Sequence, residues 1–199
     1  AGNNSFKIDG ISTSYITQIF PDDYQLDFVL TGSDADGDTA TADFSVFVKT
    51  TDSGTYEISG SDSDDVIHGT EGNDILIGGA GNDTLIGGEG DDVFQWNLGD
   101  QGQVNAPAVD TVKDFDLGDN VLDLADLLQD ESAGAIGDFI FAAQEGTDTV
   151  LYINHEGNVG VDGSNATQVI VLENYSMDGA SSADFLQGML DSGQLHIDQ

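Results

Sequence analysis

Residues 60–95 read GSDSDDVIH, GTEGNDILI, GGAGNDTLI and GGEGDDVFQ, which is one nine-residue pattern repeated four times without a gap. The first position is always glycine, the sixth is always aspartate and the eighth is always apolar. The sixth-position aspartates are Asp65, Asp74, Asp83 and Asp92, and the eighth-position residues are Ile67, Leu76, Leu85 and Phe94. A single short repeat cannot bury its apolar side chain alone, so the pattern predicts stacked coils of a solenoid.

The glycine-rich half of each repeat suits a metal-binding turn. Glycine adopts positive φ without steric cost, so such a turn can present its backbone carbonyl oxygens inward. The sixth-position carboxylate adds charge to these neutral oxygens, and a flexible shell of hard oxygen ligands suits Ca²⁺ better than Mg²⁺ or Zn²⁺. We therefore expect several bound calcium ions. The glycines expected to line them are Gly69, Gly72, Gly78, Gly79, Gly81, Gly87, Gly88 and Gly90.

One repeat makes half a coil, so neighbours along one edge lie two repeats apart. This spacing predicts that Asp65 lies beside Asp83 and that Asp74 lies beside Asp92, with an ion shared between coils. A Gly/Asp-rich flexible linker is the plain alternative, but a linker would not place an apolar residue at every eighth position.

The fifth position holds two further candidate ligands, Asn73 and Asn82. Asn tolerates left-handed backbone and bonds its own main chain, so a turn-shaping role is favoured over direct ligation. The first repeat has Ser63 where the later repeats have glycine, and it lacks their double glycine. We interpret it as a terminal cap of the solenoid, since end repeats are commonly atypical.

Composition points to cations as partners. The chain of 199 residues has 38 acidic and 3 basic side chains and a net charge of −35. Such a surface repels nucleic acid and anionic membranes, so we expect neither as a partner. Acidity that only solvates the surface is an alternative for the scattered acids, but it leaves the register of the repeats unexplained.

No cysteine is present, and 38% of the residues are hydrophobic, which suffices for a core. The missing disulfides suggest that metal ions provide the cross-linking. No apolar run has the length of a membrane-spanning helix, and no N-terminal signal peptide is visible. We expect a monomer, and the start at Ala1 favours a segment cut from a longer chain.

The residues before the repeats predict a β-hairpin. Apolar and polar residues alternate over 24–31 and over 41–48, around the loop GSDADGDTAT. Its acids Asp34, Asp36 and Asp38 are candidates for one more calcium site, with a hydrated turn as the alternative. An EF-hand is unfavoured, because its closing Glu would fall at Ser45.

After the repeats, Trp96 is expected to close the apolar end of the coil, and 99–108 to form a loop. Asp110 and Asp114 are candidates for a further calcium site, with solvated surface acids as the alternative. Strands are predicted at 139–142, 149–153, 159–161, 169–172 and 195–197. A helix is predicted over 182–190, between a capping box at Ser181 and a C-cap at Gly193. The core candidates are Val112, Phe115, Val121, Leu122, Leu124, Leu127 and Leu128.

These observations predict an all-β chain built around a calcium-bound parallel β-roll. The expected division is a β-sandwich-like segment at 1–54, the β-roll at 55–98, and a β-rich region with one short helix at 99–199. The first segment would be the end of a β-sandwich or a sheet stacked on the end of the solenoid.

The nonapeptides resemble the RTX family. Residues 55–199, including DTVKDFDLGDNVLDLADLL, resemble the C-terminal target domain of proteins exported by type I secretion, and GSDADGDTATADF resembles the end of Ig-like repeats in giant bacterial adhesins. This resemblance implies a chain secreted to the bacterial cell surface that calcium folds after export, with the export signal in the region 99–199. The implied partners are an ABC transporter, a membrane-fusion protein, an outer-membrane channel and upstream adhesin repeats in cis.

Two other functions stay open. The chain is compatible with the RTX domain of a secreted metalloprotease or lipase, or with a module that binds a host ligand. We expect no catalytic residues, because His155-Glu156 lacks the second histidine of a HExxH zinc helix and no GxSxG elbow is present.

Overall fold

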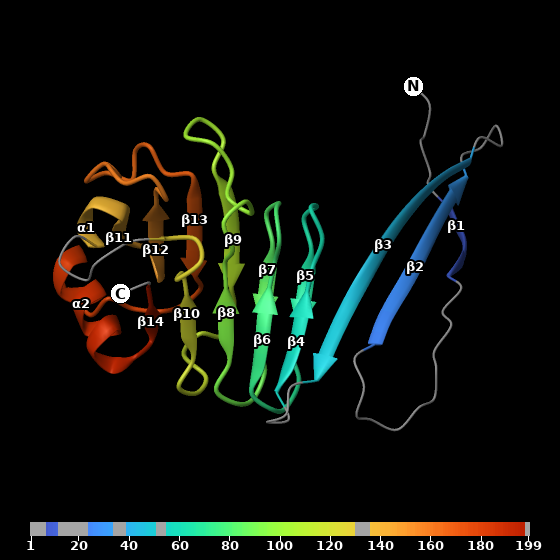
Figure 1. Ribbon diagram of the computed structural model, residues 1–199, viewed down its shortest axis with the longest axis horizontal. Coiled ribbons are helices and arrows are strands. Elements are labelled where there is room, and N and C mark those ends of the chain that lie inside the picture. Colours follow the sequence, from blue (N-terminus) through green and yellow to red (C-terminus); the bar gives the residue numbers. More distant parts are fainter. Residues whose placement is uncertain (1–6, 12–23, 34–38, 51–54, 130–135, 198–199) are drawn as a thin grey trace.

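The computed structural model describes residues 7–11, 24–33, 39–50, 55–129 and 136–197, and its regular structure is mostly β-strand. The predicted calcium loop at 34–38 lies outside the described residues, and so do its aspartates Asp34, Asp36 and Asp38. In Figure 1 the short strands of the repeats stand side by side in the middle of the molecule, in green and cyan.

The repeats form the predicted parallel β-roll. Each repeat ends in one short strand, and successive strands alternate between two sheets, so that β5 pairs with β7 and β6 pairs with β8, both in parallel. The apolar eighth position of each repeat is buried in its strand, and β6 also buries Asp74. The four strands are β5 (Val66–His68), β6 (Asp74–Ile77), β7 (Thr84–Ile86) and β8 (Val93–Gln95).

Two sheets run through the described residues. Sheet A has the order β1-β2-β3-β4-β6-β8-β10-β14, and sheet B has the order β11-β12-β13-β9-β7-β5. The other strands of sheet A are β1 (Lys7–Ile11), β2 (Tyr24–Ser33), β3 (Thr39–Thr50), β4 (Tyr56–Ser59), β10 (Val121–Asp123) and β14 (Leu195–His196). Those of sheet B are β9 (Ala108–Val112), β11 (Ile140–Glu145), β12 (Asp148–Ile153) and β13 (Gln168–Leu172).

The parallel stacking continues beyond the nonapeptides. β9 adds to β7 in sheet B and β10 adds to β8 in sheet A, both in parallel, so together they form a third coil. We call residues 60–77 the first coil, 78–95 the second coil and 108–123 the third coil. The expectation that Trp96 closes the end of the roll is therefore wrong, because β9 and β10 extend both sheets past it.

Register places the eighth-position residues in columns. In sheet B, Leu85 lies between Ile67 and Val112, and in sheet A, Phe94 lies between Leu76 and Leu122. All of these side chains are buried. Full burial of each such side chain contributes roughly 1.5–3 kcal/mol, so the columns supply a large part of the roll's stability.

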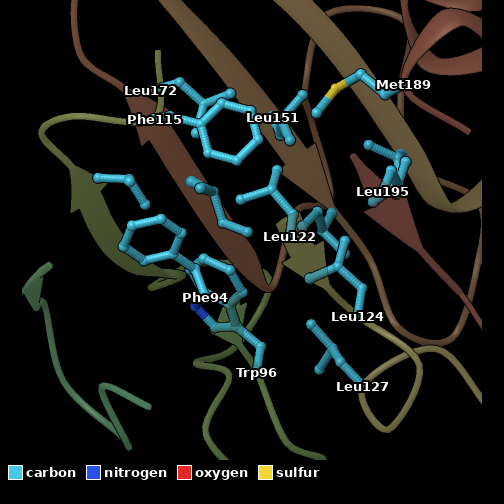
Figure 2. Close-up of a cluster of buried hydrophobic side chains, with 14 of the residues drawn as sticks. Phe94, Trp96, Phe115, Leu122, Leu124, Leu127, Leu151, Leu172, Met189 and Leu195 are labelled. Carbon is cyan, nitrogen blue, oxygen red and sulfur yellow. The ribbon is translucent and has the colours of Figure 1, made fainter. Parts of the chain in front are cut away.

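The C-terminal region closes the same core. Figure 2 shows side chains from the second coil, the third coil and the C-terminal strands meeting in one cluster, among them Phe94, Trp96, Phe115 and Leu151. Helix α1 (Ile136–Phe139) contributes Ile136, and helix α2 (Ser182–Ser192) contributes Leu186 and Met189. The core candidates from the sequence are buried, except for the partly exposed Val121.

Several sequence predictions can be compared directly. The hairpin is confirmed as antiparallel β2 and β3, and the helix is confirmed between N-cap Ser181 and C-cap Gly193, whose φ is 79°. The predicted strand at 159–161 is wrong. Its neighbours Asn158 and Gly163 have positive φ of 64° and 77°, which bends the chain into turns and leaves Val161 87% exposed.

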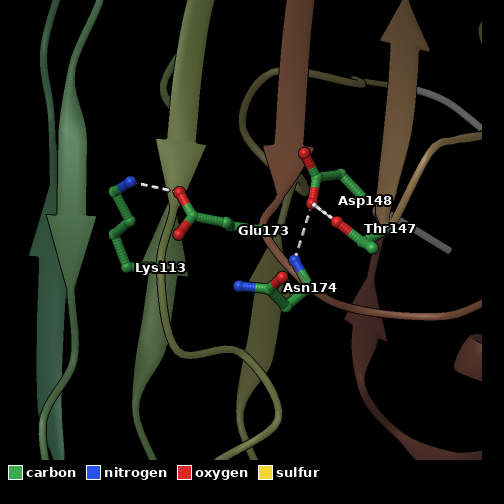
Figure 3. Close-up of polar contacts among 5 residues, drawn as sticks. All are labelled: Lys113, Thr147, Asp148, Glu173 and Asn174. Atoms are coloured by element: carbon green, nitrogen blue, oxygen red, sulfur yellow. Dashed lines mark hydrogen bonds and ion pairs between the residues drawn. The ribbon is translucent and has the colours of Figure 1, made fainter.

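Polar contacts join the neighbouring strands β9, β13 and β12 at one end of sheet B (Figure 3). Lys113, just after β9, forms an ion pair with Glu173, just after the neighbouring β13. Oδ1 of Asp148 accepts hydrogen bonds from Thr147 Oγ1 at 3.0 Å and from the N–H of Asn174 at 2.8 Å. Within the described parts of the chain, no helix has the length and apolar character needed to cross a bilayer.

Candidate metal sites

The sixth-position carboxylates link one coil to the next. Oδ1 of Asp83 accepts a hydrogen bond from the N–H of Asp65, and Oδ1 of Asp92 accepts one from the N–H of Asp74, each at 2.8 Å. The expected neighbours two repeats apart are thus brought together, in turns that lead into sheet B and sheet A respectively.

The third coil continues this ladder of hydrogen bonds with different spacing. Oδ1 of Asp110 accepts from the N–H of Asp83 at 2.8 Å, and Oδ1 of Asn120 accepts from the N–H of Asp92 at 2.7 Å. Asn120 was not among the candidates from the sequence, because it lies outside the nonapeptide register. Its amide nitrogen also bonds the carbonyl oxygens of the loop at 114–117, which fixes its orientation.

The glycines allow the turns to stack closely. Gly79 and Gly88, at the second position, have φ of 91° and 102°. A Cβ on either would lie 2.2 Å from the carbonyl oxygen of the second-position residue in the preceding coil, Ser61 or Thr70. These carbonyl oxygens therefore face the glycines of the next coil, as a turn lined with backbone oxygen requires.

The same stacking recurs at the fourth position. Gly81 and Gly90 have φ of 125° and 117°, and a Cβ there would press on the backbone of Ser63 or Gly72. At the first position, a Cβ on Gly78 or Gly87 would meet Oδ2 of the sixth-position aspartate of the same repeat, at 2.4 and 2.2 Å. Gly69 instead faces the carbonyl oxygen of Gly87 across the coils.

Fifth-position side chains tie the turns to one another. Oδ1 of Asn73 accepts from the N–H of Asp91, and Oδ1 of Asn82 accepts from the N–H of Val109, each at 2.9 Å. Asp64 accepts similarly from the N–H of Asn82 at 2.8 Å. These bonds support the turn-shaping interpretation of the fifth position.

Two carboxylate oxygens in the second coil have no partner. Oδ2 of Asp83 and Oδ2 of Asp92 are buried without a hydrogen bond, and the residues are only 2% and 0% exposed. Burial raises the pKa of Asp83 to about 7 and that of Asp92 to about 6, against the lowering effect of the backbone hydrogen bond that each Oδ1 accepts. A cation is the natural partner for such an oxygen, since an unpaired buried charge is costly.

The donor set fits Ca²⁺. Carboxylate and carbonyl oxygens meet in these turns, and Ca²⁺ prefers oxygen ligands in flexible arrangements. Within the described ranges, no three His, Cys, Asp or Glu side chains gather around one point. An ion held here would therefore take most of its oxygens from the backbone, and its charge would compensate the buried carboxylate.

Asp110 and Asp114 differ from the second-coil aspartates, because both of their carboxylate oxygens have protein donors. Oδ2 of Asp110 accepts from Trp96 Nε1 and from Gln168 Nε2, each at 2.7 Å. Asp114 accepts from the N–H groups of Gly87 and Gly88, each at 2.9 Å. Burial still raises the pKa of Asp110, against the effect of these hydrogen bonds.

Comparison with known proteins agrees with this geometry. Residues 59–94 match the family model described as the RTX calcium-binding nonapeptide repeat, in four copies. No curated protein matches the chain significantly.

Two solved structures are similar to parts of it. A subunit of the mannuronan C5-epimerase of Azotobacter vinelandii is 27% identical, over 69% of this chain and 80% of that one, with a TM-score of 0.42. The extracellular lipase LipA of Serratia marcescens is 17% identical, over 94% of this chain and 30% of that one, with a TM-score of 0.39. Because residues 59–94 match this family model, the four nonapeptides are RTX calcium-binding repeats, and calcium is their cofactor.

Proposed function

We propose that residues 55–199 form a calcium-triggered folding module of an exported protein. The observation that carries the proposal is the pair of buried, unpartnered oxygens on Asp83 and Asp92. Without a cation, the folded roll has to bury two carboxylates whose Oδ2 atoms have no donor, or protonate them. With Ca²⁺ bound, the same two groups stabilise the fold.

Linkage turns such sites into a switch between compartments. A site that holds free ligand at about 100 times its dissociation constant adds about 2.7 kcal/mol to folding stability, and a site far below that concentration adds almost nothing. Repulsion within a chain of net charge −35 also disfavours the compact state when calcium is scarce. The chain would stay unfolded inside the cell and fold outside it.

The finer proposal is that this module ends a large bacterial surface adhesin exported by type I secretion. The RTX repeats support the secreted class, and the antiparallel β2–β3 hairpin supports an adhesin-like segment before the roll. The signal read by the transporter would lie in about the last fifty residues, which include α2. The division into 1–54, 55–98 and 99–199 belongs to this proposal.

A calcium titration tests the folding role. The full chain, in a chelator at neutral pH, is titrated with Ca²⁺ while far-UV circular dichroism and the fluorescence of Trp96 are recorded. We expect a cooperative gain of β-structure that chelator reverses and that Mg²⁺ does not reproduce. A chain that is already folded in chelator at neutral pH would refute the switch.

A second experiment tests the export role. The full chain and a variant lacking residues 150–199 are expressed in a bacterium that carries a type I secretion apparatus. Calcium-dependent folding outside the cell and loss of export by the shortened variant are expected. Equal export of both would place the signal elsewhere and overturn this part of the proposal.

An RTX domain of a secreted enzyme is the other candidate, because the folding role would be the same. The two differ in what is attached to the module. The sequence of the full-length gene separates them, since tandem Ig-like repeats favour the adhesin and a protease or lipase domain favours the enzyme. Direct binding of a host ligand is the third candidate, and specific binding on a glycan array would favour it.

A further inference from the structure

The aspartates of the first coil have hydrogen-bond donors that the second coil lacks. Oδ2 of Asp65 accepts from the N–H and the hydroxyl of Ser61, at 2.7 and 2.8 Å. Oδ2 of Asp74 accepts in the same way from Thr70, at 2.6 and 2.8 Å. Two independent repeats thus use a hydroxyl residue at the second position for the same purpose.

The second coil cannot repeat this arrangement. Its second-position residues, Gly79 and Gly88, stack on the carbonyl oxygens of Ser61 and Thr70 so closely that a Cβ would lie 2.2 Å from them. Both also have positive φ, which side chains rarely adopt. Close stacking therefore requires glycine there, and glycine has no hydroxyl to offer a carboxylate.

The third coil supplies donors of another kind. Oδ2 of Asp110 accepts from Trp96 Nε1 and Gln168 Nε2, which lie just after the second coil and in β13 respectively. On the other edge, the ladder position is taken by the neutral amide of Asn120, so no charge needs compensation there. In the first and third coils, protein groups therefore donate to Oδ2 of every ladder aspartate, or a neutral amide replaces the aspartate.

We propose that the calcium-dependent part of this ladder is confined to the second coil, with one ion at Asp83 and one at Asp92. Ser61 and Thr70 on the N-terminal side, and Trp96 and Gln168 on the C-terminal side, take the place of calcium for the outer aspartates. This inference rests on the proposed calcium-dependent folding and names the residues that limit it.

The energetic reason lies in the number of hydrogen bonds that Oδ2 of each aspartate accepts. A buried carboxylate oxygen that accepts two hydrogen bonds is largely compensated, whereas a buried carboxylate oxygen with no donor is not. Calcium binding therefore gains most at Asp83 and Asp92, where it replaces no existing hydrogen bond. At Asp65 and Asp74, an ion would have to displace the two hydrogen bonds that Oδ2 accepts in order to reach that oxygen.

Counting bound ions tests the proposal. The full chain and the variants Asp83→Asn, Asp92→Asn and Asp65→Asn are dialysed to equilibrium against calcium, and bound calcium is measured by elemental analysis. Asparagine is a matched change, because Asn120 shows that an amide oxygen can accept the bond between coils. We expect Asp83→Asn and Asp92→Asn each to bind one ion fewer, and Asp65→Asn to bind as many as the unaltered chain.

The hydroxyl provides a second test that does not alter an aspartate. Thr70→Val removes the donor at constant shape and Thr70→Ser retains it. We expect Thr70→Val to lower the urea midpoint of the calcium-loaded protein relative to Thr70→Ser, with an unchanged ion count. This pair decides the question if Asp83→Asn does not fold.

The outcomes separate the two proposals. An unaltered chain that binds no calcium would refute the folding switch itself. Calcium binding in which Asp65→Asn loses an ion as Asp83→Asn does, or in which Thr70→Val loses one, would overturn only the confinement to the second coil. Equal urea midpoints for Thr70→Val and Thr70→Ser would also overturn it.

Discussion

At the scale of single residues, the second position of each repeat decides how the aspartate four residues later is compensated. Ser61 and Thr70 donate to Oδ2 of Asp65 and Asp74, whereas glycine at the same position leaves Oδ2 of the next aspartate along each edge without a donor. The nonapeptide pattern predicted the sixth-position aspartates but not this difference between coils. The hydroxyl residues at the second position, Ser61 and Thr70, were the signal in the sequence from which this difference could have been predicted.

Acid should partly replace calcium at these two aspartates. In the metal-free fold the pKa is raised to about 7 for Asp83 and about 6 for Asp92, against an ordinary value of 3.8. Between these values the folded state binds protons that the unfolded state does not hold, so its stability rises as the pH falls. In chelator, we expect more β-structure by circular dichroism at about pH 5 than at about pH 8.

The double variant Asp83→Asn, Asp92→Asn provides the control for this pH effect. It has no buried carboxylate in the second coil to protonate. We expect it to retain more folded structure than the unaltered chain in chelator at high pH, and to lose most of the pH dependence. Identical spectra of the unaltered chain at both pH values would contradict the prediction.

Replacing an aspartate with alanine tests the assigned phase of the repeat. Asp83→Ala should raise the calcium concentration at the folding midpoint by at least about tenfold, which corresponds to about 1.4 kcal/mol. Asp62→Ala should change it little, because Asp62 is exposed at the third position. Calcium titrations followed by circular dichroism measure both, and equal shifts would refute the phase.

At the scale of elements, α2 shows how local signals set a boundary. The N–H of Asp184 donates to Oγ of Ser181 at 3.2 Å, and the hydroxyl of Ser181 donates to the carboxylate of Asp184 at 2.7 Å. Gly193 ends the helix with its N–H bonded to the carbonyl oxygen of Leu190. The helix then packs Leu186 and Met189 into the shared core.

Loss of this cap should weaken the calcium-loaded protein. Ser181→Ala removes the acceptor of the Asp184 N–H, and we expect a loss of about 1 kcal/mol in the free energy of unfolding. Urea denaturation at saturating calcium measures it. Gln187→Ala, at an exposed position of the same helix, should change stability by less than about 0.5 kcal/mol. A larger loss for Gln187→Ala would contradict the capping explanation.

The strands could be predicted where a strict period was present. The nonapeptide strands and the β2–β3 hairpin follow from periods of nine and two residues. The third coil was missed as part of the roll, because its ladder residues lie 27 and 28 residues after Asp83 and Asp92, whereas the repeats use 18. The nine and ten additional residues break the nonapeptide period in the sequence, although β9 and β10 still pair in parallel with β7 and β8. The expected strand at 159–161 failed because apolar composition was counted without regard to the turn-forming Asn and Gly around it.

At the scale of the whole molecule, the roll and the C-terminal region share one core and one set of hydrogen bonds. The cluster around Phe94 includes side chains from β9, β10, β12, β13, α2 and β14. Backbone N–H groups of the second coil donate hydrogen bonds to side chains that follow the nonapeptides. Asp83 donates to Asp110, Asp92 donates to Asn120, and Gly87 and Gly88 donate to Asp114. The second coil is therefore completed by residues outside the nonapeptides.

Truncation tests this dependence. We expect residues 1–98, expressed alone, to remain unfolded at calcium concentrations that saturate the full chain. Without residues 99–199, the side chains of Phe94 and Trp96 lose most of their buried surroundings, and removing burial of even one large aromatic costs roughly 3–5 kcal/mol. Residues 55–199 retain the shared core and should keep a calcium-induced transition. Circular dichroism and Trp96 fluorescence, recorded during calcium titration of both fragments, measure the difference, and folding of residues 1–98 at the full chain's midpoint would show that the repeats fold without their C-terminal partner.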